Sequence, residues 1–278
     1  MSEQRGDELS SATLRVAAAQ FRPGKDAAAN RAAVTAFAED ALAQGARLVA
    51  FPEYSSAFDL PFSPELVALA EPLDGPYVSH LIAEADRLGI AIVSGMLEVS
   101  GEANKFRNTV VAVLPGQGVV ATYRKQHLYD AFGAKESDWV VPGDLTAPEV
   151  FELDGVTVGL QTCYDLRFPE ATRQLVDAGA ELVLVPAQWV PGPAKEHHWR
   201  TLATARAIEN TVYLLAADQA APAGIGCSLV VSPAGETLAD LGDEPGLAVA
   251  TIERAELDRV RSVNPALQLR RYRVSPAE

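Results

Sequence analysis

The sequence predicts an α/β domain in which strands and helices form layers. Short apolar runs with strand character alternate with Ala-rich segments of helical period, and this alternation is typical of layered α/β folds. No Ser/Gly-rich linker or low-complexity segment divides the 278 residues, which favours one continuous domain. Two similar segments, GARLVAFPEY at 45–54 and GAELVLVPAQ at 179–188, indicate either a structural repeat or the ordinary composition of a helix-to-strand junction.

The elements follow from these patterns in chain order. Each predicted strand is a run of apolar, often β-branched residues of strand length. These runs are 14–21, 47–52, 90–97, 109–115, 119–124, 157–164, 181–186, 212–218, 227–232 and 247–252. Each predicted helix is a longer segment with helical spacing of its apolar residues. These segments are 26–44, 76–88, 169–178 and 197–210.

Composition and charge exclude several classes of function. The formal net charge of −14 and the pI near 4.7 argue against the broad basic surface that nucleic acids or anionic membranes require, so a small-molecule partner is favoured. The opening MSEQRGDELSSATLR lacks an apolar signal core. No apolar run approaches the roughly 20 residues that cross a bilayer. We therefore predict a cytoplasmic protein.

The cysteine and histidine patterns favour neither disulfides nor a metal. Two cysteines make no disulfide framework, and Cys163 and Cys227 are expected to remain thiols in a reducing compartment. The four histidines show no HExxH spacing, and no paired CxxC motif occurs. We expect no metal site.

Three reactive side chains occur at the ends of three predicted strands. Glu53 follows 47–52, Lys125 follows 119–124, and Cys163 lies near the end of 157–164. Ligands of open α/β folds bind outside the carboxyl ends of the strands. The fold can therefore bring together residues that are 72 (125−53) and 38 (163−125) positions apart.

These three residue types are chemically complementary. A free thiol is only a few per cent ionised at neutral pH, but a nearby ammonium lowers its pKa and a carboxylate can accept its proton. Cys163 would then be a nucleophile and Glu53 a general base. Lys125 and the N–H that follows the cysteine could stabilise an oxyanion. Such a site requires no metal or organic cofactor.

Each residue also has an ordinary structural explanation. Cysteine is among the most buried residue types, so a cysteine at a strand end is more often inert core. Lys125 and Glu53, taken singly, could be solvated surface charges. The second Phe-Pro-Glu has a clear structural role, because Pro169 suits the first helical position and the acidic Glu170 favours the helix dipole. We interpret Glu170 as structural and Glu53 as chemical.

Separated motifs make the sequence similar to the nitrilase superfamily of carbon-nitrogen hydrolases. They are FPEY (51–54), YRKQHLYD (123–130), ESDWVVPGD (136–144), CYDLRFPE (163–170) and HWRTLATARAIENTVYLL (198–215), in the family's order and spacing. The resemblance extends from about residue 13 to residue 273. It implies a four-layer αββα sandwich, a Glu-Lys-Cys triad at Glu53, Lys125 and Cys163, and a homodimer or higher homo-oligomer. The subunits would pair through the helices near 169–178 and 198–210.

The same resemblance assigns roles to further residues. Glu136 matches a second glutamate that often lines the pocket, where it would orient Lys125 or help proton transfer; the alternative is an ordinary loop carboxylate. His127 is expected to brace the lysine loop by hydrogen bonding rather than to act as a base. Tyr164 would supply the N–H of the oxyanion site.

The residues after the cysteine are similar to the Nit-type amidases, which include ω-amidases and deaminated-glutathione amidases. The chain reads Cys-Tyr-Asp-Leu-Arg from residue 163, where true nitrilases typically have Cys-Trp-Glu. Arg167 is then a candidate clamp for a substrate carboxylate, since a guanidinium binds one through two parallel hydrogen bonds. Pairing of Arg167 with Asp165 or Glu170 is the alternative. Cys227, where many such amidases have His, leaves the exact substrate open.

The expected function is that of a cysteine-dependent amidase. Cys163 attacks a small carboxylate-bearing amide, ammonia leaves, and water activated by Glu53 hydrolyses the thioester. Two alternatives remain: an N-carbamoyl-amino-acid hydrolase, which would also release carbon dioxide, and a catalytically idle binding or interaction module. We predict a flexible tail at 1–12, a carbon-nitrogen hydrolase domain at 13–260 and a C-terminal arm at 261–278. The arm is Arg-rich. It is either a solvated segment or a segment that contacts a neighbouring subunit.

Overall fold

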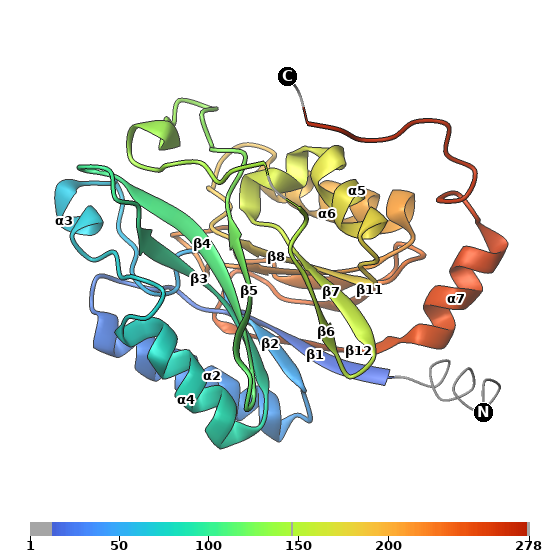
Figure 1. Ribbon diagram of the computed structural model, residues 1–278, viewed down its shortest axis with the longest axis horizontal. Helices are drawn as coiled ribbons and strands as arrows, with labels where there is room; N and C mark the ends of the chain where they lie inside the picture. Colours follow the sequence, from blue (N-terminus) through green and yellow to red (C-terminus); the bar gives the residue numbers. More distant parts are fainter. Residues whose placement is uncertain (1–12, 146, 277–278) are drawn as a thin grey trace.

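Two six-stranded sheets pack face to face between two layers of helices (Figure 1). A computed structural model describes residues 13–145 and 147–276. The predicted tail at 1–12 lies outside the described residues. The two sheets and their outer helices confirm the predicted four-layer αββα sandwich.

The first sheet has the strand order β12-β1-β2-β3-β4-β5 and the second β11-β10-β9-β8-β7-β6. The strands of the first are β1 Thr13–Gln20, β2 Leu48–Ala50, β3 Ala91–Val99, β4 Phe106–Leu114, β5 Gly118–Arg124 and β12 Gly246–Glu253. Those of the second are β6 Val150–Leu153, β7 Val156–Leu160, β8 Leu182–Ala187, β9 Tyr213–Asp218, β10 Leu229–Val231 and β11 Thr237–Asp240. The helices are α2 Ala27–Ala43, α3 Pro64–Val67, α4 Pro76–Leu88, α5 Pro169–Asp177, α6 Lys195–Asn210 and α7 Arg254–Val263, with short 3₁₀ helices η1 Glu136–Asp138 and η2 Cys163–Arg167.

The two sheets repeat one topology. Strands β1, β2 and β3 are parallel neighbours, and so are β7, β8 and β9. Helices α2 and α4 connect the first three strands, whereas α5 and α6 connect the second three. The similar segments 45–54 and 179–188 therefore carry topologically equivalent strands, β2 and β8. Of the two explanations that the sequence left open, the topology favours the structural repeat.

Alternate residues of the central strands join different apolar layers. Val16 of β1 and Leu184 of β8 belong to the cluster between the two sheets. Their neighbours Ala17 and Val183 lie under the outer helices, α2 and α4 in the first case and α5 and α6 in the second. Because side chains alternate along a strand, a strand that is buried on both faces has consecutive apolar residues. These continuous apolar runs are the pattern that predicted the strands.

One predicted element is wrong in a way that matters for function. The strand predicted at 157–164 ends at Leu160, and Cys163 begins the 3₁₀ helix η2 with a positive φ of 47°. A capping box ends the strand: the Thr162 side chain accepts from the backbone of Asp165, while Asp165 Oδ2 accepts the Thr162 N–H at 3.1 Å. The edge strands β6 and β11 and the helices α3 and α7 were also not predicted.

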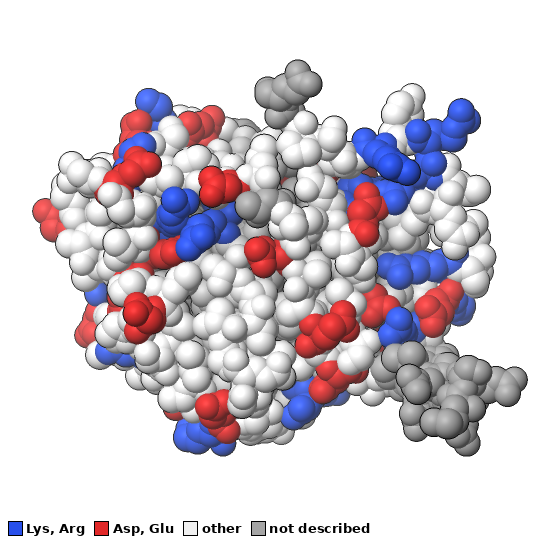
Figure 2. Space-filling view, in the orientation of Figure 1, with Lys and Arg blue, Asp and Glu red and all other residues white. Residues whose placement is uncertain are grey.

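Several arginines near the C-terminus contact other parts of the same chain. Arg254 pairs with Glu181 at 2.9 Å and Arg270 with Asp177 at 2.5 Å. Basic side chains gather where the segment after α7 crosses the upper right of the view in Figure 2. Helix α7 continues across residue 260, the predicted domain boundary. The place of the arm at a subunit interface stays a prediction. Within the described residues no helix has the length and apolar character to span a bilayer.

Candidate active site

A cavity of about 270 Å³ opens where four loops meet, after β2, β5, β7 and β8. Its walls include the three side chains that the sequence singled out and residues of each loop. The lining residues are Glu53, Tyr54, Leu60, Pro61, Phe62, Lys125, Tyr129, Ala134, Lys135, Glu136, Trp139, Cys163, Tyr164, Arg167, Gln188, Trp189, Val190 and Lys195. The fold thus brings together residues that are far apart in the chain.

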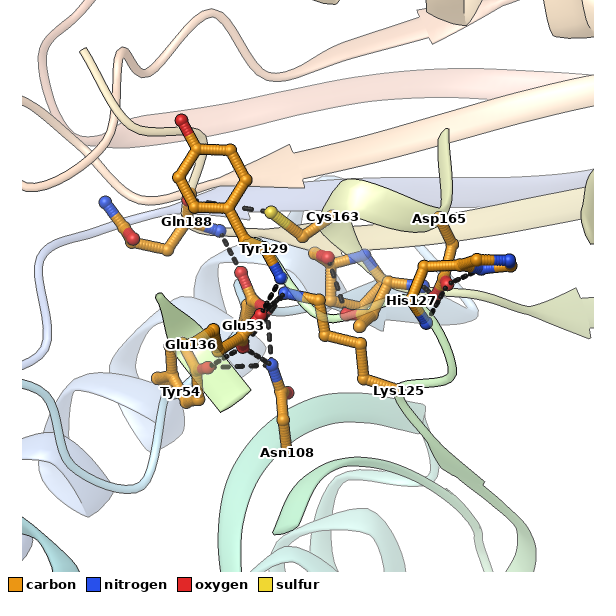
Figure 3. Close-up of polar contacts among 12 residues, drawn as sticks. Glu53, Tyr54, Asn108, Lys125, His127, Tyr129, Glu136, Cys163, Asp165 and Gln188 are labelled. Atoms are coloured by element: carbon orange, nitrogen blue, oxygen red, sulfur yellow. Dashed lines mark hydrogen bonds and ion pairs between the residues drawn. The ribbon is translucent and has the colours of Figure 1, made fainter. Parts of the chain in front are cut away.

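Lys125 lies between two buried carboxylates (Figure 3). Its Nζ is 2.9 Å from Glu53 Oε1 and 2.9 Å from Glu136 Oε2. The side chains of Lys125 and Glu53 are 2% and 1% exposed, so water screens these contacts little. One cation between two anions leaves this end of the cavity with a net negative charge.

Both oxygens of Glu53 accept hydrogen bonds from rigid parts of the fold. Asn108 of β4 donates its Nδ2 to Oε1 at 2.5 Å, and the backbone N–H of Gln188 donates to Oε2 at 2.7 Å. The Gln219 side chain donates to the carbonyl of Glu53 at 2.8 Å. These contacts come from both sheets, so they fix the position of the carboxylate.

Gly95 of β3 permits this position because it packs against the backbone of Glu53. A Cβ at residue 95 would lie 2.7 Å from Glu53 Cα and 2.8 Å from the carbonyl oxygen of Pro52. We expect Gly95→Ala to displace Glu53, to lower kcat/KM by roughly 100-fold and to lower the free energy of unfolding by about 1–3 kcal/mol. Amide-hydrolysis kinetics and urea unfolding measure the two effects.

The matched control for that substitution is Gly24→Ala. A Cβ at Gly24 meets no heavy atom within 4 Å, so activity and stability should stay close to those of the unchanged protein. Full activity of Gly95→Ala would show that the carboxylate tolerates displacement.

Cys163 points into the cavity from the start of η2. Its Sγ lies 3.6 Å from the carbonyl oxygen of Gln188. The N–H of the same residue donates to Glu53, so the backbone of Gln188 contacts both the thiol and the carboxylate. Tyr164 is the second residue of η2, where N–H groups have no acceptor within the helix. Its N–H therefore has no acceptor within η2, and its role as an oxyanion donor stays a prediction.

The pKa shifts describe a thiol that holds its proton at rest. Burial, and after it the charge of Glu53, raises the pKa of Cys163 well above its usual value, against the opposing effect of Lys125. Burial also raises the pKa of Glu53, although Lys125 opposes it. Burial disfavours the charge of Lys125, but Glu136 and Glu53 hold its pKa well above the usual range. A carboxylate with a raised pKa is a better proton acceptor for the thiol.

The sequence did not identify two residues that support the carboxylates. Tyr54 donates its hydroxyl hydrogen to Glu136 Oε1 at 2.6 Å, and Asn108 Nδ2 lies 2.9 Å from the Tyr54 oxygen. Burial raises the pKa of Tyr54 well above its usual value, which keeps it a donor. The signals were present: Tyr54 follows Glu53 directly, and Asn108 is a polar residue in an apolar strand.

His127 lies behind the cavity wall instead of lining it. Its Nδ1 is 2.7 Å from Asp165 Oδ1, which also accepts the backbone N–H of His127 at 3.1 Å. Asp165 Oδ2 accepts the hydroxyl of Tyr123 at 2.7 Å. Asp165 therefore joins the helix of the cysteine to the strand and loop that carry Lys125.

Arg167 does line the cavity and has no carboxylate partner there. Its guanidinium lies 4.8 Å from the ring centre of Trp189, and one of its terminal nitrogens is 3.3 Å from His198 Nδ1. Asp165 is occupied by the contacts above, so the alternative pairing of Arg167 with Asp165 does not occur in the described residues.

Sequence comparison decides the family. The signature of the carbon-nitrogen hydrolases matches residues 15–262. The chain belongs to the carbon-nitrogen hydrolase family. This membership confirms the resemblance found in the sequence and makes the protein an enzyme of carbon-nitrogen bond hydrolysis.

The relatives of this carbon-nitrogen hydrolase include named amidases. A hydrolase of Mycobacterium tuberculosis is 41% identical over 257 residues, which cover 86% of this chain and 89% of the relative. A deaminated glutathione amidase of Escherichia coli is 39% identical over 206 residues, 74% of this chain and 78% of the relative. These similarities confirm the predicted amidase type of function.

A solved structure shows the same fold with a modified cysteine. It is a glutamate-to-glutamine mutant of the amidase from Nesterenkonia sp., in which the acetamide moiety of fluoroacetamide has added covalently to the active-site cysteine. It is 30% identical, covers 94% of this chain and 95% of its own, and superposes with a TM-score of 0.77.

Proposed function

We propose that this carbon-nitrogen hydrolase cleaves a small carboxylate-bearing amide through a thioester on Cys163. The observation that carries the proposal is the convergence of Glu53, Lys125 and Cys163 in one cavity, with Lys125 held between two buried carboxylates. The covalent addition at the active-site cysteine of the Nesterenkonia amidase supports a cysteine nucleophile.

The first half of the reaction forms the thioester. Glu53 accepts the thiol proton of Cys163 as the sulfur attacks the amide carbon. The carbonyl oxygen becomes an oxyanion, which accepts hydrogen bonds from the Lys125 ammonium and the Tyr164 N–H. Glu53 then gives its proton to the amide nitrogen, the C–N bond breaks, and ammonia leaves.

The second half restores the enzyme. A water molecule gives a proton to Glu53 as the water oxygen attacks the thioester carbon. A second oxyanion forms and accepts hydrogen bonds from the Lys125 ammonium and the Tyr164 N–H. The C–S bond breaks, the acid leaves, and the sulfur recovers the proton from Glu53. Glu136 helps to hold Lys125 in position for the oxyanion, since it binds the ammonium together with Glu53.

A carboxylate on the substrate is part of the proposal. Arg167 lines the cavity four residues after Cys163, and its Nε lacks a hydrogen-bond partner among the described residues. Relatives named deaminated glutathione amidase act on a molecule that carries carboxylates, which supports the same substrate class here.

The test is to trap the thioester and identify the products. Acid-quenched enzyme from a reaction with the monoamide of glutaric acid should carry one added acyl group on the peptide that contains Cys163, by mass spectrometry, and should release ammonia. Cys163→Ala protein is the blank. Turnover without a Cys163 adduct, and with activity retained in Cys163→Ala, would reject the mechanism.

The same experiment separates the alternatives. An N-carbamoyl amino acid offered as substrate should release no carbon dioxide if the amidase assignment holds. An idle module would form no adduct and release no ammonia from any of these compounds, and its Cys163 and Cys227 would react equally slowly with a thiol reagent.

We infer further that the protein works in the cytoplasm as a homodimer. Two buried thiols with no disulfide in the described residues suit a reducing compartment. The outer helix α6 leaves Ile208 exposed, and the arm leaves Leu269 and Tyr272 exposed, which are surfaces that a second subunit could cover. Light scattering after size-exclusion chromatography tests the dimer, and a monomeric mass would reject it.

A further inference from the structure

Two cations share one wall of the cavity, and neither has a carboxylate partner in the described part of the chain. Arg167 comes from η2 and Lys195 from the start of α6. Neither side chain takes part in any ion pair formed by the described residues. In a chain with a net charge of −14, two unpaired cations beside a nucleophile are unusual and require an explanation.

The side chains that contact the Lys195 ammonium are neutral and hold it in place. Its Nζ donates to the Tyr129 hydroxyl at 2.6 Å and lies 4.0 Å from the ring centre of Phe132. The residue is only 6% exposed. Burial and the charge of Arg167 lower the pKa of Lys195. A buried ammonium that keeps donors free is costly unless an anion arrives to bind them.

Arg167 is arranged in the same way. Its guanidinium lies against the rings of Trp189, at 4.8 Å, and Phe132, at 5.3 Å. Its Nε is buried and unbonded among the described residues. Phe132 thus covers both cations from one side, and this exposed ring belongs to the loop after Lys125.

We propose that Lys195 and Arg167 together form a two-cation subsite that binds the carboxylate of the acyl half of the substrate. Lys195 is then a determinant of specificity for acidic amides. The inference rests on the proposed function and extends it to a residue outside the triad.

The spacing favours the acyl half. Arg167 and Cys163 are the two ends of η2, and four steps of a 3₁₀ helix rise roughly 8 Å. A four- or five-carbon dicarboxylic chain can bridge that span when one end is bonded to the sulfur and the other is hydrogen-bonded to the guanidinium. The group formed by Glu53, Lys125 and Glu136 has a net negative charge, which repels a carboxylate from the end of the cavity where the thiol attacks. The cavity therefore orients an amide that carries one carboxylate, with the carboxylate toward Arg167 and Lys195.

The test compares Lys195→Met with the matched control Lys135→Met. Lys135 lies at the cavity mouth but is exposed and pairs with Asp138 at 3.0 Å. The loss of one charge-assisted hydrogen bond should raise KM for the monoamide of glutaric acid about tenfold or more. Pentanamide has a methyl in place of the carboxylate, and its KM should change by less than about twofold. Lys195→Arg keeps the charge and should recover much of the loss.

A binding measurement separates this inference from the proposed function. The monoamide of glutaric acid should bind Cys163→Ala protein in a calorimetric titration, and Lys195→Met in that background should weaken it about tenfold, whether or not the unchanged protein hydrolyses any amide. Tyr129→Phe removes only the hydroxyl that holds Lys195 and should weaken binding less. An unchanged affinity for the monoamide when Lys195→Met is added to the folded Cys163→Ala protein, or an equal rise of KM for pentanamide, would overturn the subsite.

Discussion

Replacing Lys125 with Met is expected to abolish amide hydrolysis and to lower the free energy of unfolding by about 3–5 kcal/mol. The ammonium contacts Glu53 and Glu136 at 2.9 Å each, and all three side chains are buried. Met fills the same space but leaves two carboxylates facing each other with no cation between them. Loss of a buried partner costs more than the pair contributes, because the remaining charge is left unpaired.

The loss in free energy of unfolding caused by Lys125→Met should increase with pH. Burial already raises the pKa of Glu53, and Lys125 acts against that rise. Without Lys125 the folded-state pKa rises further above the unfolded value of about 4.3. A carboxyl with a raised folded pKa binds more protons in the folded state, so the variant should lose stability as pH rises above that value. Urea unfolding at pH 5 and pH 8 should show a larger deficit at pH 8.

Two variants make the Lys125 prediction specific. Lys135→Met removes an exposed cation whose ion pair is with Asp138, and it should cost less than about 1 kcal/mol. Adding Glu136→Gln to Lys125→Met removes one of the two opposed charges and should recover part of the stability without restoring activity. A Lys125→Met protein as stable as the unchanged protein at pH 8 would contradict the charge balance described here.

The sequence could predict the triad because strand ends are visible in it. Glu53, Lys125 and Cys163 each follow an apolar run, and the layered fold places such positions at one edge. The similarity of the segments around β2 and β8 only suggested a repeat, since a strand buried on both faces has a similar composition wherever it occurs. These features depend on local pattern and on the topology that the pattern implies.

The supporting residues could not be predicted in the same way. Asn108 lies within β4, where a polar residue indicates only that something polar is near. Lys195 is one of several charged residues in the first turns of α6, and its position depends on Tyr129, which is 66 residues away. The 3₁₀ helix at Cys163 arises from the bonds of Asp165 to Thr162 and to the lysine strand. Such contacts between distant loops leave no periodic signal.

Replacing Glu53 with Gln is expected to lower kcat/KM for amide hydrolysis by a thousandfold or more. Removing a positioned acid-base group typically costs about 10²–10⁴-fold, and Glu53 transfers a proton in both halves of the proposed reaction. The amide of Gln keeps the size of the side chain, although its single oxygen can accept from only one of the two donors, Asn108 or the Gln188 N–H. Single-turnover kinetics should show that thioester formation and hydrolysis are both slow.

The same substitution should make the thiol easier to ionise. After burial, the charge of Glu53 is the largest cause that raises the pKa of Cys163, whereas Lys125 lowers it. Neutral Gln removes the first effect and keeps the second, so the thiol pKa should fall. Thiolate absorbance near 240 nm, followed against pH, should move to lower pH. A protein with a more acidic thiol and almost no turnover would show that Glu53 acts by moving protons rather than by generating a thiolate.

Glu170→Gln is the matched control, because it changes the glutamate of the second Phe-Pro-Glu. Glu170 is an exposed residue in the first turn of α5. Its loss removes a favourable interaction with the helix dipole, typically 0.3–1 kcal/mol, and should leave both the turnover and the titration of Cys163 unchanged. If Glu53→Gln instead raised the thiol pKa, or lowered activity no more than Glu170→Gln does, Glu53 would not be the base. The chemistry would then have to use Glu136, the other carboxylate on Lys125.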